Sequence, residues 1–196
     1  MKRLTTERLI LEPVTSQNAA VLWRIMQSAH LREFQDVPRY TREEFERRVA
    51  ARPKQFDALA IGRFEWLMVL AESRQAIGWV SLRVGDHARG TAELAYSVLA
   101  AYRVAGYATE AARAVVTFAF ERSELRMVEA CCVPANHGSR RLLARIGFTE
   151  TRVQRNGAIV RGRPVDIVIF ELTRAQWKAA SGDASPAPRE KRRSSG

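Results

Sequence analysis

The sequence predicts a mixed α/β domain in which about four helices cover a central, mostly antiparallel sheet of about seven strands. Three observations support this fold class. Helical and strand patterns follow one another in the order β, α, α, β, β, β, α, β, α, β, β. Three of the strand patterns succeed each other at hairpin spacing. The 196 residues suffice for one domain, and 46% of them are hydrophobic.

The chain begins with a strand and two helices. Residues 4–13, "LTTERLILEP", alternate loosely between apolar and polar side chains and predict one strand. A helix over about 16–28 follows, with Ser16 as its N-cap. Thr41 begins the second helix, in which Glu44 stands at the spacing of a capping box.

A group of three strands comes next. The segments 65–72, 76–84 and 91–99 are rich in apolar residues. The gaps between them, "SRQ" and "GDHARG", have the length and composition of hairpin connections, which predicts antiparallel pairing. The remaining expected elements are a helix over 106–122, a strand over 126–133, a helix over 137–146, and strands over 148–155 and 165–172.

The net charge is +11, and part of it lies near the end of the chain. The segment "SGDASPAPREKRRSSG" is rich in Ser, Pro, Ala and Gly, and it has too little apolar surface to form a core. We therefore expect one folded domain over 1–177 and a disordered basic tail over 178–196. The run "REKRR" is either part of a solvated tail or an arm that contacts the ribosome, RNA or another acidic surface.

Neither a disulfide framework nor a metal site is expected. Cys131 and Cys132 are neighbours, so their side chains point to opposite faces of a strand and a bridge between them would be strained. The three histidines, His30, His87 and His137, have no ligand spacing with these cysteines.

Membrane insertion is not expected either. No uninterrupted apolar run approaches the ~18 residues that a membrane span needs. The basic N-terminus does not match a signal peptide, because Glu12 and Pro13 interrupt its apolar run and no small-residue cleavage site is present. These observations predict a cytoplasmic protein.

A lone glycine precedes the helix expected over 106–122. In "RVAGYA", residues 103–108, Gly106 permits close approach to the backbone and Arg103 adds a positive charge. The first amides of a helix lack intrahelical partners and attract phosphate groups. Taken alone, this pattern agrees with two interpretations: an ordinary turn before a helix, or a binding site for a pyrophosphate.

Several segments resemble the GNAT superfamily of acyl-CoA-dependent N-acetyltransferases. "RVAGYA" matches the R/Q-x-x-G-x-G/A loop of that family. The longer segments "AELAYSVLAAYRVAGYATEAARAVVTFAF", "VPANHGSRRLLARIGF" and "RGRPVDIVIFEL" are similar to the branch of the ribosomal-protein N-terminal acetyltransferases RimJ and RimL. The likeness runs from "TERLILEPV" to Trp177.

This resemblance implies acetyl-CoA as the co-substrate. It also implies a GNAT-type sheet in which the fourth strand, 91–99, splays from the fifth, 126–133, so that the pantetheine arm can lie between them and pair with free backbone groups. The pyrophosphate would then bind the backbone of 104–109. The implied cofactor-binding residues are Ser97, Val98, Leu99, Arg103, Val104, Ala105, Gly106, Tyr107, Ala108, Thr109, Asn136 and Ser139.

Two catalytic residues are implied by the same resemblance. Glu93 occupies the usual acidic position of the family and is the candidate base, acting directly or through water. Two alternatives remain: Glu93 is an ordinary carboxylate paired to an arginine, or Glu129 is the base. Leu143 stands where the family often has a tyrosine that protonates the departing thiolate, so Ser139 becomes the candidate for orienting or protonating the sulfur of coenzyme A.

Other positions bear on the loop and the acceptor. Val104 and Ala95 stand where many relatives have glycine, which predicts a stiffer loop and strand. Asp166 lies at a position that is usually acidic in this branch, where it either pairs with an arginine or holds the incoming amine. The resemblance also places the acceptor wall in the segment 16–53, including Phe34, Tyr40 and Arg42.

The implied activity is transfer of acetyl to a primary amine by direct attack in a ternary complex, and the favoured acceptor is a protein or peptide N-terminal α-amine. Three alternatives stay open: a small-molecule amine as acceptor, a non-catalytic acyl-CoA sensor, and a protein that mainly binds RNA or the ribosome. The expected assembly is a monomer or a homodimer.

Overall fold

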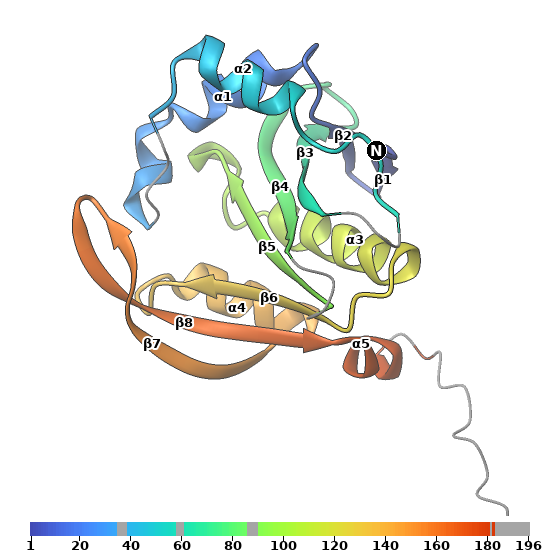
Figure 1. Cartoon of the computed structure of the whole chain (residues 1–196), viewed down its shortest axis with the longest axis vertical. Coiled ribbons are helices and arrows are strands. Elements are labelled where there is room, and N and C mark those ends of the chain that lie inside the picture. Colours follow the sequence, from blue (N-terminus) through green and yellow to red (C-terminus); the bar gives the residue numbers. More distant parts are fainter. Residues whose placement is uncertain (35–38, 58–60, 86–89, 181, 183–196) are drawn as a thin grey trace, which may run out of the picture.

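The computed structural model describes residues 1–34, 39–57, 61–85, 90–180 and 182. Its centre is an eight-stranded sheet with the order β1-β2-β3-β4-β5-β6-β8-β7 (Figure 1). All neighbouring strands are antiparallel except β5 and β6, which are parallel. The strands are β1 (Leu4–Thr5), β2 (Leu9–Pro13), β3 (Gly62–Leu70), β4 (Ala76–Val84), β5 (Thr91–Val98), β6 (Met127–Cys132), β7 (Thr149–Val160) and β8 (Arg163–Thr173).

Helices cover both faces of this sheet. α1 and α2 lie on one face, where Leu22 and Phe45 share a core with Trp79. α3 and α4 lie on the other face, and Val115 and Leu143 belong to the larger core there. The helices are α1 (Ala19–Met26), α2 (Arg42–Ala50), α3 (Tyr107–Arg122), α4 (His137–Ile146) and α5 (Arg174–Ala180), with 3₁₀ turns η1 (Ala29–Glu33) and η3 (Ala100–Tyr102).

Strand β3 contributes to both cores. Phe64, Trp66 and Met68 point towards α3, whereas Leu67 and Val69 point towards α1 and α2. Successive side chains of a strand alternate between the two faces of a sheet. A strand that is covered on both sides is therefore apolar on both faces, as β3 is from Trp66 to Leu70.

The predicted fold class is confirmed, since the sheet is mixed, mostly antiparallel and flanked by helices. The predicted capping box is also present. Thr41 Oγ1 accepts the amide of Glu44 at 3.2 Å, and the Glu44 carboxylate accepts the amide of Thr41 at 2.9 Å. Strand β4 has the predicted bounds, Ala76–Val84.

The prediction of one strand over 4–13 is wrong. β1 and β2 are two strands of a hairpin, because the chain turns at Thr6, whose amide donates to the carbonyl of Leu9 at 2.9 Å and whose Oγ1 accepts the amide of Leu9 at 3.1 Å. Ser16 is not the N-cap of α1 either. Asn18 is the N-cap residue of α1, and Ser16 lies in the turn that precedes it.

β5 and β6 separate after only three cross-strand pairs. The pairs run from Thr91–Met127 to Glu93–Glu129, and none follows within the described residues. In Figure 1 the two strands diverge, so that the sheet opens as a V with β1–β5 on one side and β6–β8 on the other. The predicted splay is confirmed. Its position between β5 and β6 matches the fourth and fifth strands expected from the sequence.

The end of the described chain holds a helix, α5, that the sequence analysis does not predict. Arg174 anchors it by donating to the carbonyls of Phe120 at 2.6 Å and Leu125 at 2.8 Å. Trp177 packs on Phe120 with 5.3 Å between ring centres. Most of the expected tail, 178–196, lies outside the described residues. Within the described part of the chain, no helix combines the length and apolar character that crossing a bilayer requires.

Candidate active site

The loop predicted to bind pyrophosphate connects η3 to α3. Gly106 is the N-cap residue of α3 and has a φ of +86°, a conformation that favours glycine. Because glycine has no side chain, no N-cap side chain accepts from the first amides of α3. Val104 also has a positive φ, +58°, and its side chain is fully exposed. The loop therefore adopts a left-handed conformation even at a β-branched residue, where it is strained.

Arg8, which the sequence analysis does not select, supports this loop from the turn between β1 and β2. Its Nη1 donates to the carbonyl of Ala105 at 3.0 Å, and its guanidinium carbon lies 4.6 Å from the ring centre of Tyr107. Glu110 of α3 accepts from the amide and from Nε of Arg8, both at 2.8 Å. These partners lie 97 and 102 residues further along the chain, so no local pattern in "TERL" reveals them.

Glu110 is held in its charged form. Burial raises the pKa of Glu110. The hydrogen bonds from Thr6 and from the backbone and side chain of Arg8 lower it by more, so the pKa of Glu110 is below its ordinary value. Thr6 Oγ1 donates to the carboxylate at 2.6 Å. The negative charge of Glu110 is thus offset by Arg8 and by two neutral donors. Together these contacts fix the first turn of α3 to the β1–β2 hairpin.

Arg103, the charged residue predicted at the rim, lies between η3 and α3. It forms an ion pair with Glu33 of η1, with 3.3 Å between Nη1 and the carboxylate. η1 belongs to the segment that the sequence analysis assigns to the acceptor wall. The ion pair therefore connects that segment to the loop of residues 103–109, which we call the phosphate loop after its predicted ligand. The other predicted loop residues run directly into α3: Ala105, Tyr107, Ala108 and Thr109.

The edge of β5 that faces β6 has no strand partner beyond Glu93 within the described residues. On its other edge, Val98 pairs with Gly78 of β4 and the Leu99 amide donates to the Ile77 carbonyl at 2.8 Å. The Leu99 amide is therefore not one of the free groups that the sequence analysis expects there. An unpaired strand edge presents N–H and C=O groups to an extended ligand. That edge runs past Ser97 towards the phosphate loop.

The two candidate bases lie side by side where the V closes. Glu93 and Glu129 form the last cross-strand pair of β5 and β6. Arg83 donates through Nε to the Glu93 carboxylate at 2.9 Å. Arg152 lies 3.7 Å from the Glu129 carboxylate and 2.7 Å from that of Glu171. Each candidate carboxylate thus has an arginine beside it, and the alternative interpretation of Glu93 as half of an ion pair describes its contacts in this structure.

Tyr96 is a site residue that the sequence analysis does not select. Its hydroxyl lies 2.7 Å from Ser139 Oγ, so the side chain of a β5 residue meets the first turn of α4 across the opening of the V. Burial raises the pKa of the Tyr96 phenol, and the hydrogen bond to Ser139 opposes this only in part. Burial also raises the pKa of Cys132, whose thiol hydrogen-bonds to Ser139. Tyr96, Ser139 and Cys132 therefore form one cluster.

The start of α4 has the predicted geometry. Asn136 Oδ1 accepts the amide of Ser139 at 3.0 Å, which is plain N-capping. Leu143, one turn further, is fully buried in the core and carries no exchangeable proton. The phenol that reaches this helix comes from Tyr96 on β5 instead. A signal was present in "AELAY", where Tyr96 follows Glu93 by three residues and so faces the opposite side of the strand.

A cavity of about 550 Å³ opens on the outer side of α3. It begins at Gly106 and Thr109 of the phosphate loop and reaches Arg145 at the end of α4. The other lining residues are Thr6, Glu110, Arg113, Ala114 and Thr117. The lining thus combines the start of α3 with two arginines.

Residues predicted around the acceptor have varied surroundings. Asp166 accepts the Asn156 amide at 2.9 Å, so its partner is a backbone group rather than the arginine considered from the sequence. Tyr40 packs under Arg48 with 4.4 Å from the guanidinium to the ring centre. Arg42 pairs with Glu46 along α2 at 2.8 Å. Phe34 ends η1.

Within the described residues, no three His, Cys, Asp or Glu side chains gather closely enough to hold a metal ion. Cys131 and Cys132 are both free thiols, the first exposed and the second buried. The V itself carries the carboxylates of Glu93 and Glu129, the hydroxyls of Tyr96 and Ser139, and the thiol of Cys132.

Comparison with known proteins gives one family and a consistent set of relatives. The family model described as "Acetyltransferase (GNAT) domain" matches residues 8–149. The Bacillus subtilis protein named "Putative ribosomal N-acetyltransferase YdaF" is 35% identical over 101 residues, which are 52% of this chain and 55% of YdaF. The chain thus spans about half the length of that relative.

Two further relatives match over most of their length. The Bacillus licheniformis protein named "Uncharacterized N-acetyltransferase p20" is 24% identical over 181 residues, 90% of this chain and 99% of p20. Among solved structures, RimL, the ribosomal L7/L12 α-N-protein acetyltransferase solved in complex with coenzyme A, superposes with a TM-score of 0.74. It is 15% identical and covers 88% of this chain and 98% of its own, so it shows a shared fold.

Proposed function

The chain belongs to the GNAT acetyltransferase domain family, and from this premise we propose that it transfers an acetyl group from acetyl-CoA to a primary amine. Direct attack of the amine within a ternary complex is the proposed route. The observation that carries the proposal is the arrangement of the Gly106 loop beside the unpaired edge of β5 at the mouth of the V. The helix start after Gly106 suits a pyrophosphate, and the unpaired edge of β5 suits an extended chain that contains amide groups.

The residues proposed to hold the co-substrate fit its two chemical parts. The backbone of Val104–Thr109 offers helix-terminal amides to the pyrophosphate, and Gly106 has no Cβ to obstruct it. The β5 edge at Val98 offers backbone groups to the pantetheine arm, because the N–H and C=O of Val98 point away from β4, whereas those of Ser97 and Leu99 point towards it. Asn136 and Ser139 lie on the other side of the opening, at the start of α4. Bound there, acetyl-CoA supplies a thioester, whose carbonyl carbon is open to attack by a neutral amine.

Glu93 is the proposed base, with Glu129 as the competing assignment. An ammonium group has no lone pair to attack a carbonyl carbon, so one proton must leave the acceptor nitrogen. Both carboxylates lie where β5 and β6 diverge, next to the place proposed for the reacting atoms. The proton passes from nitrogen to the carboxylate, directly or through water. Arg83 donates through Nε to one oxygen of the Glu93 carboxylate at 2.9 Å and so holds that side chain in place.

Ser139 is the proposed proton donor to the leaving sulfur, and Tyr96 supports it. As the new C–N bond forms, the nitrogen becomes positively charged and releases its second proton to water. As the C–S bond breaks, the sulfur keeps the bonding electron pair and takes a proton from Ser139 Oγ. Tyr96, 2.7 Å away, passes its own proton to Ser139 and later recovers one from solvent. This pair of hydroxyls takes the place of the tyrosine that Leu143 replaces.

The proposed acceptor is the α-amine of a protein or peptide N-terminus. An α-amine with a pKa near 8 is neutral in roughly one molecule in ten at pH 7, whereas a lysine near 10.4 is neutral in about one in 2,500. The difference corresponds to roughly 3 kcal/mol that a base acting on lysine would have to supply. The word "ribosomal" in the name of YdaF supports a protein acceptor. A small-molecule amine is the alternative acceptor.

The test is turnover on matched peptides. The protein is incubated with acetyl-CoA and a panel of peptides with a free N-terminus, together with copies that are α-acetylated but keep one lysine, and products are identified by mass spectrometry. We expect acetylation at the α-amine and its loss in Glu93→Gln. If the protein binds acetyl-CoA yet acetylates neither the peptides nor any component of a cell extract, it is a non-catalytic sensor and the proposal fails.

A further inference from the structure

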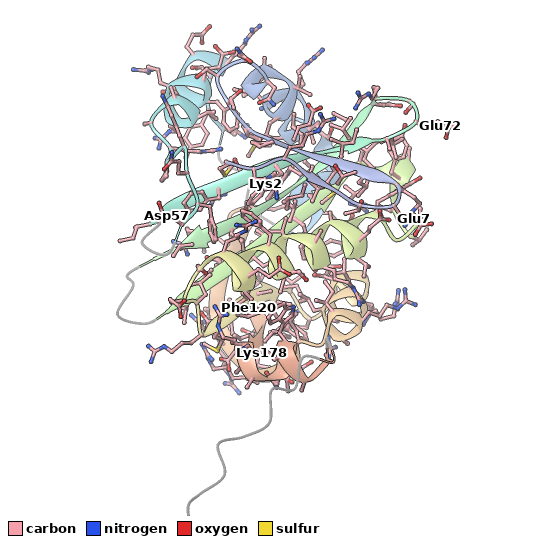
Figure 2. All side chains as sticks on the ribbon, turned by 90° about the vertical axis from the view of Figure 1, so that its right-hand side faces the viewer. Lys2, Glu7, Asp57, Glu72, Phe120 and Lys178 are labelled. Carbon is pink, nitrogen blue, oxygen red and sulfur yellow. The ribbon has the colours of Figure 1, made fainter. Side chains whose placement is uncertain are left out.

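The cavity on the outer side of α3 has a positive wall that the proposed chemistry does not use. Figure 2 looks onto α3, with Glu7 of the β1–β2 turn labelled at the right-hand edge. The cavity, about 550 Å³, starts at the phosphate loop and continues along α3 to α4. Small-molecule sites usually occupy between about 300 and 1,000 Å³. The space is therefore large enough for a nucleoside.

Two guanidinium groups supply its charge. Arg113 and Arg145 both line the cavity, and neither forms an ion pair with an acidic side chain among the described residues. Arg113 Nη2 donates to the carbonyl of Arg145 at 2.9 Å, which fixes the position of its guanidinium at the junction of α3 and α4. A guanidinium has five N–H donors, so this contact leaves several for a ligand.

The one acidic residue of the lining does not cancel this charge. Glu110 is already bound by Arg8, with 2.7 Å between Nη2 and the carboxylate, and by Thr6. The excess positive charge of the cavity therefore lies with Arg113 and Arg145. Arginine pairs well with phosphate through parallel N–H donors, and a dianionic phosphate monoester carries enough negative charge for both arginines of the lining.

The spacing along α3 connects this wall to the phosphate loop. Gly106 and Arg113 are seven residues apart, which is about 10 Å along a helix axis. That is the reach of a nucleotide whose diphosphate binds at Gly106 and whose ribose carries a further phosphate. Coenzyme A has such a phosphate on its ribose 3′-oxygen, next to the diphosphate.

We propose that Arg113 and Arg145 bind the ribose 3′-phosphate of coenzyme A, so that the cavity selects the 3′-phosphorylated cofactor over dephospho-coenzyme A. This inference rests on the proposed function, because it needs the diphosphate of coenzyme A at the Gly106 loop. It assigns a role to two residues that take no part in acetyl transfer. The 3′-phosphate is then an anchor for the nucleotide end of the co-substrate.

The test compares coenzyme A with 3′-dephospho-coenzyme A by calorimetry at one ionic strength. We expect the wild-type protein to bind coenzyme A about tenfold or more tightly, since a hydrogen bond to a charged group contributes that much. In Arg113→Gln and Arg145→Gln this preference should fall to about threefold or less, while dephospho-coenzyme A binds as before. Unchanged binding of the dephospho form also shows that each variant is folded.

Arg122→Gln is the matched control, because Arg122 is exposed at the far end of the same helix and does not line the cavity. Its preference should equal that of the wild type. A wild-type protein that binds both forms equally, or arginine variants that keep the full preference, would overturn the inference alone. Absence of binding to either form would overturn the proposed function and this inference with it.

Discussion

At the scale of single residues, Val104 shows how the phosphate loop is shaped. The residue has a φ of +58° and an exposed side chain, so burial does not compensate for its strained backbone. A β-branched residue in this region costs of order 1–2 kcal/mol. The loop geometry is therefore imposed by its surroundings, chiefly Gly106 and the Arg8 contact with Ala105.

Val104→Gly should make the protein more stable. Glycine adopts the positive φ without strain, although it gains entropy in the unfolded chain, so we expect the free energy of unfolding to rise by up to about 1 kcal/mol. Urea denaturation measures this change. Val153→Gly, at an exposed position within β7, should instead lower stability. Equal destabilisation by both substitutions would contradict the strain at position 104.

Tyr96→Phe should lower kcat about 10- to 100-fold, because the variant keeps the ring but removes the hydroxyl that supports Ser139. The KM for acetyl-CoA should change by no more than about twofold, since the substitution removes an interaction used in the reaction step. Tyr102→Phe is the matched control, because its hydroxyl contacts Gln75, away from α4. A rise in KM with unchanged kcat would show that Tyr96 serves only binding.

The pH dependence of the Tyr96 hydroxyl has a definite direction. Burial raises its pKa above the ordinary value of about 10, so the phenol keeps its proton at every pH below that value. Wild-type kcat should therefore show no loss through tyrosine ionisation up to about pH 10.

Residues with a local signature could be predicted from the sequence, whereas residues defined by distant contacts could not. Gly106 and Asn136 can be recognised by their position before a predicted helix, and both are N-cap residues in the structure. Arg8 and Tyr96 act through partners 102 and 43 residues away. Their roles follow from the packing of the sheet, which a single sequence does not encode in any short spacing.

At the scale of elements, the end of β5 is brought close to β4 by a glycine. A Cβ on Gly78 would lie 2.3 Å from the carbonyl oxygen of Ser97, so the backbone of one strand would have to move. Ser97 is on the part of β5 proposed to bind the pantetheine arm. Gly78 therefore sets the position of that edge within the V.

Gly78→Ala should destabilise the protein by about 1–3 kcal/mol and weaken its affinity for coenzyme A, because the shift of β5 displaces the binding edge. Urea denaturation and calorimetry measure the two effects. Gly85→Ala is the control, since an added Cβ there meets nothing within 4 Å. If Gly78→Ala unfolds with the same free energy as the wild type and binds coenzyme A equally tightly, β5 can move without cost.

The contact of the β1–β2 hairpin with α3 should make stability depend on acid. The pKa of Glu110 is lowered on folding, so its contribution is present above the ordinary glutamate pKa and is lost as pH falls through the lower, folded value. Glu110→Gln should thus lose less stability than the wild type between about pH 6 and about pH 3. Glu121→Gln, exposed on the same helix, should behave as the wild type. Identical acid profiles for all three proteins would contradict this.

Elements were predictable where a periodic pattern had clear ends. α2 has its capping box and β4 its predicted bounds, because both signals are local. The sequence predicts one strand in place of the β1–β2 hairpin because "LTTERLILEP" contains neither glycine nor an early proline to mark its turn. α5 has no clear local signal in the sequence. Its stability comes from Arg174 and Trp177, which contact the end of α3 and the segment after it.

At the scale of the whole molecule, the V is held at its vertex by three cross-strand pairs between β5 and β6. A ligand bound in its opening touches both sides of the sheet. Binding to the folded form alone stabilises it by mass action, by about 2.7 kcal/mol at a ligand concentration of 100 Kd.

Coenzyme A at that concentration should therefore raise Tm by roughly 5–10 °C, from a shift of about 2–4 °C per kcal/mol for a chain of this size. Hydrogen exchange should slow in β5 and at the start of α4. Differential scanning calorimetry measures the first effect and mass spectrometry the second. Protection confined to α3 would mean that the ligand does not enter the opening.

The hydrogen bond between Tyr96 and Ser139 joins a strand on one side of the V to a helix on the other. The distance between these hydroxyls therefore reports the angle between the two halves of the molecule. A variant that widens this angle, even by a change remote from the reacting atoms, would separate the two hydroxyls and, in the proposed reaction, slow the departure of the thiol. Through this one contact, the proposed proton transfer to sulfur depends on the angle at which the sheet opens between β5 and β6.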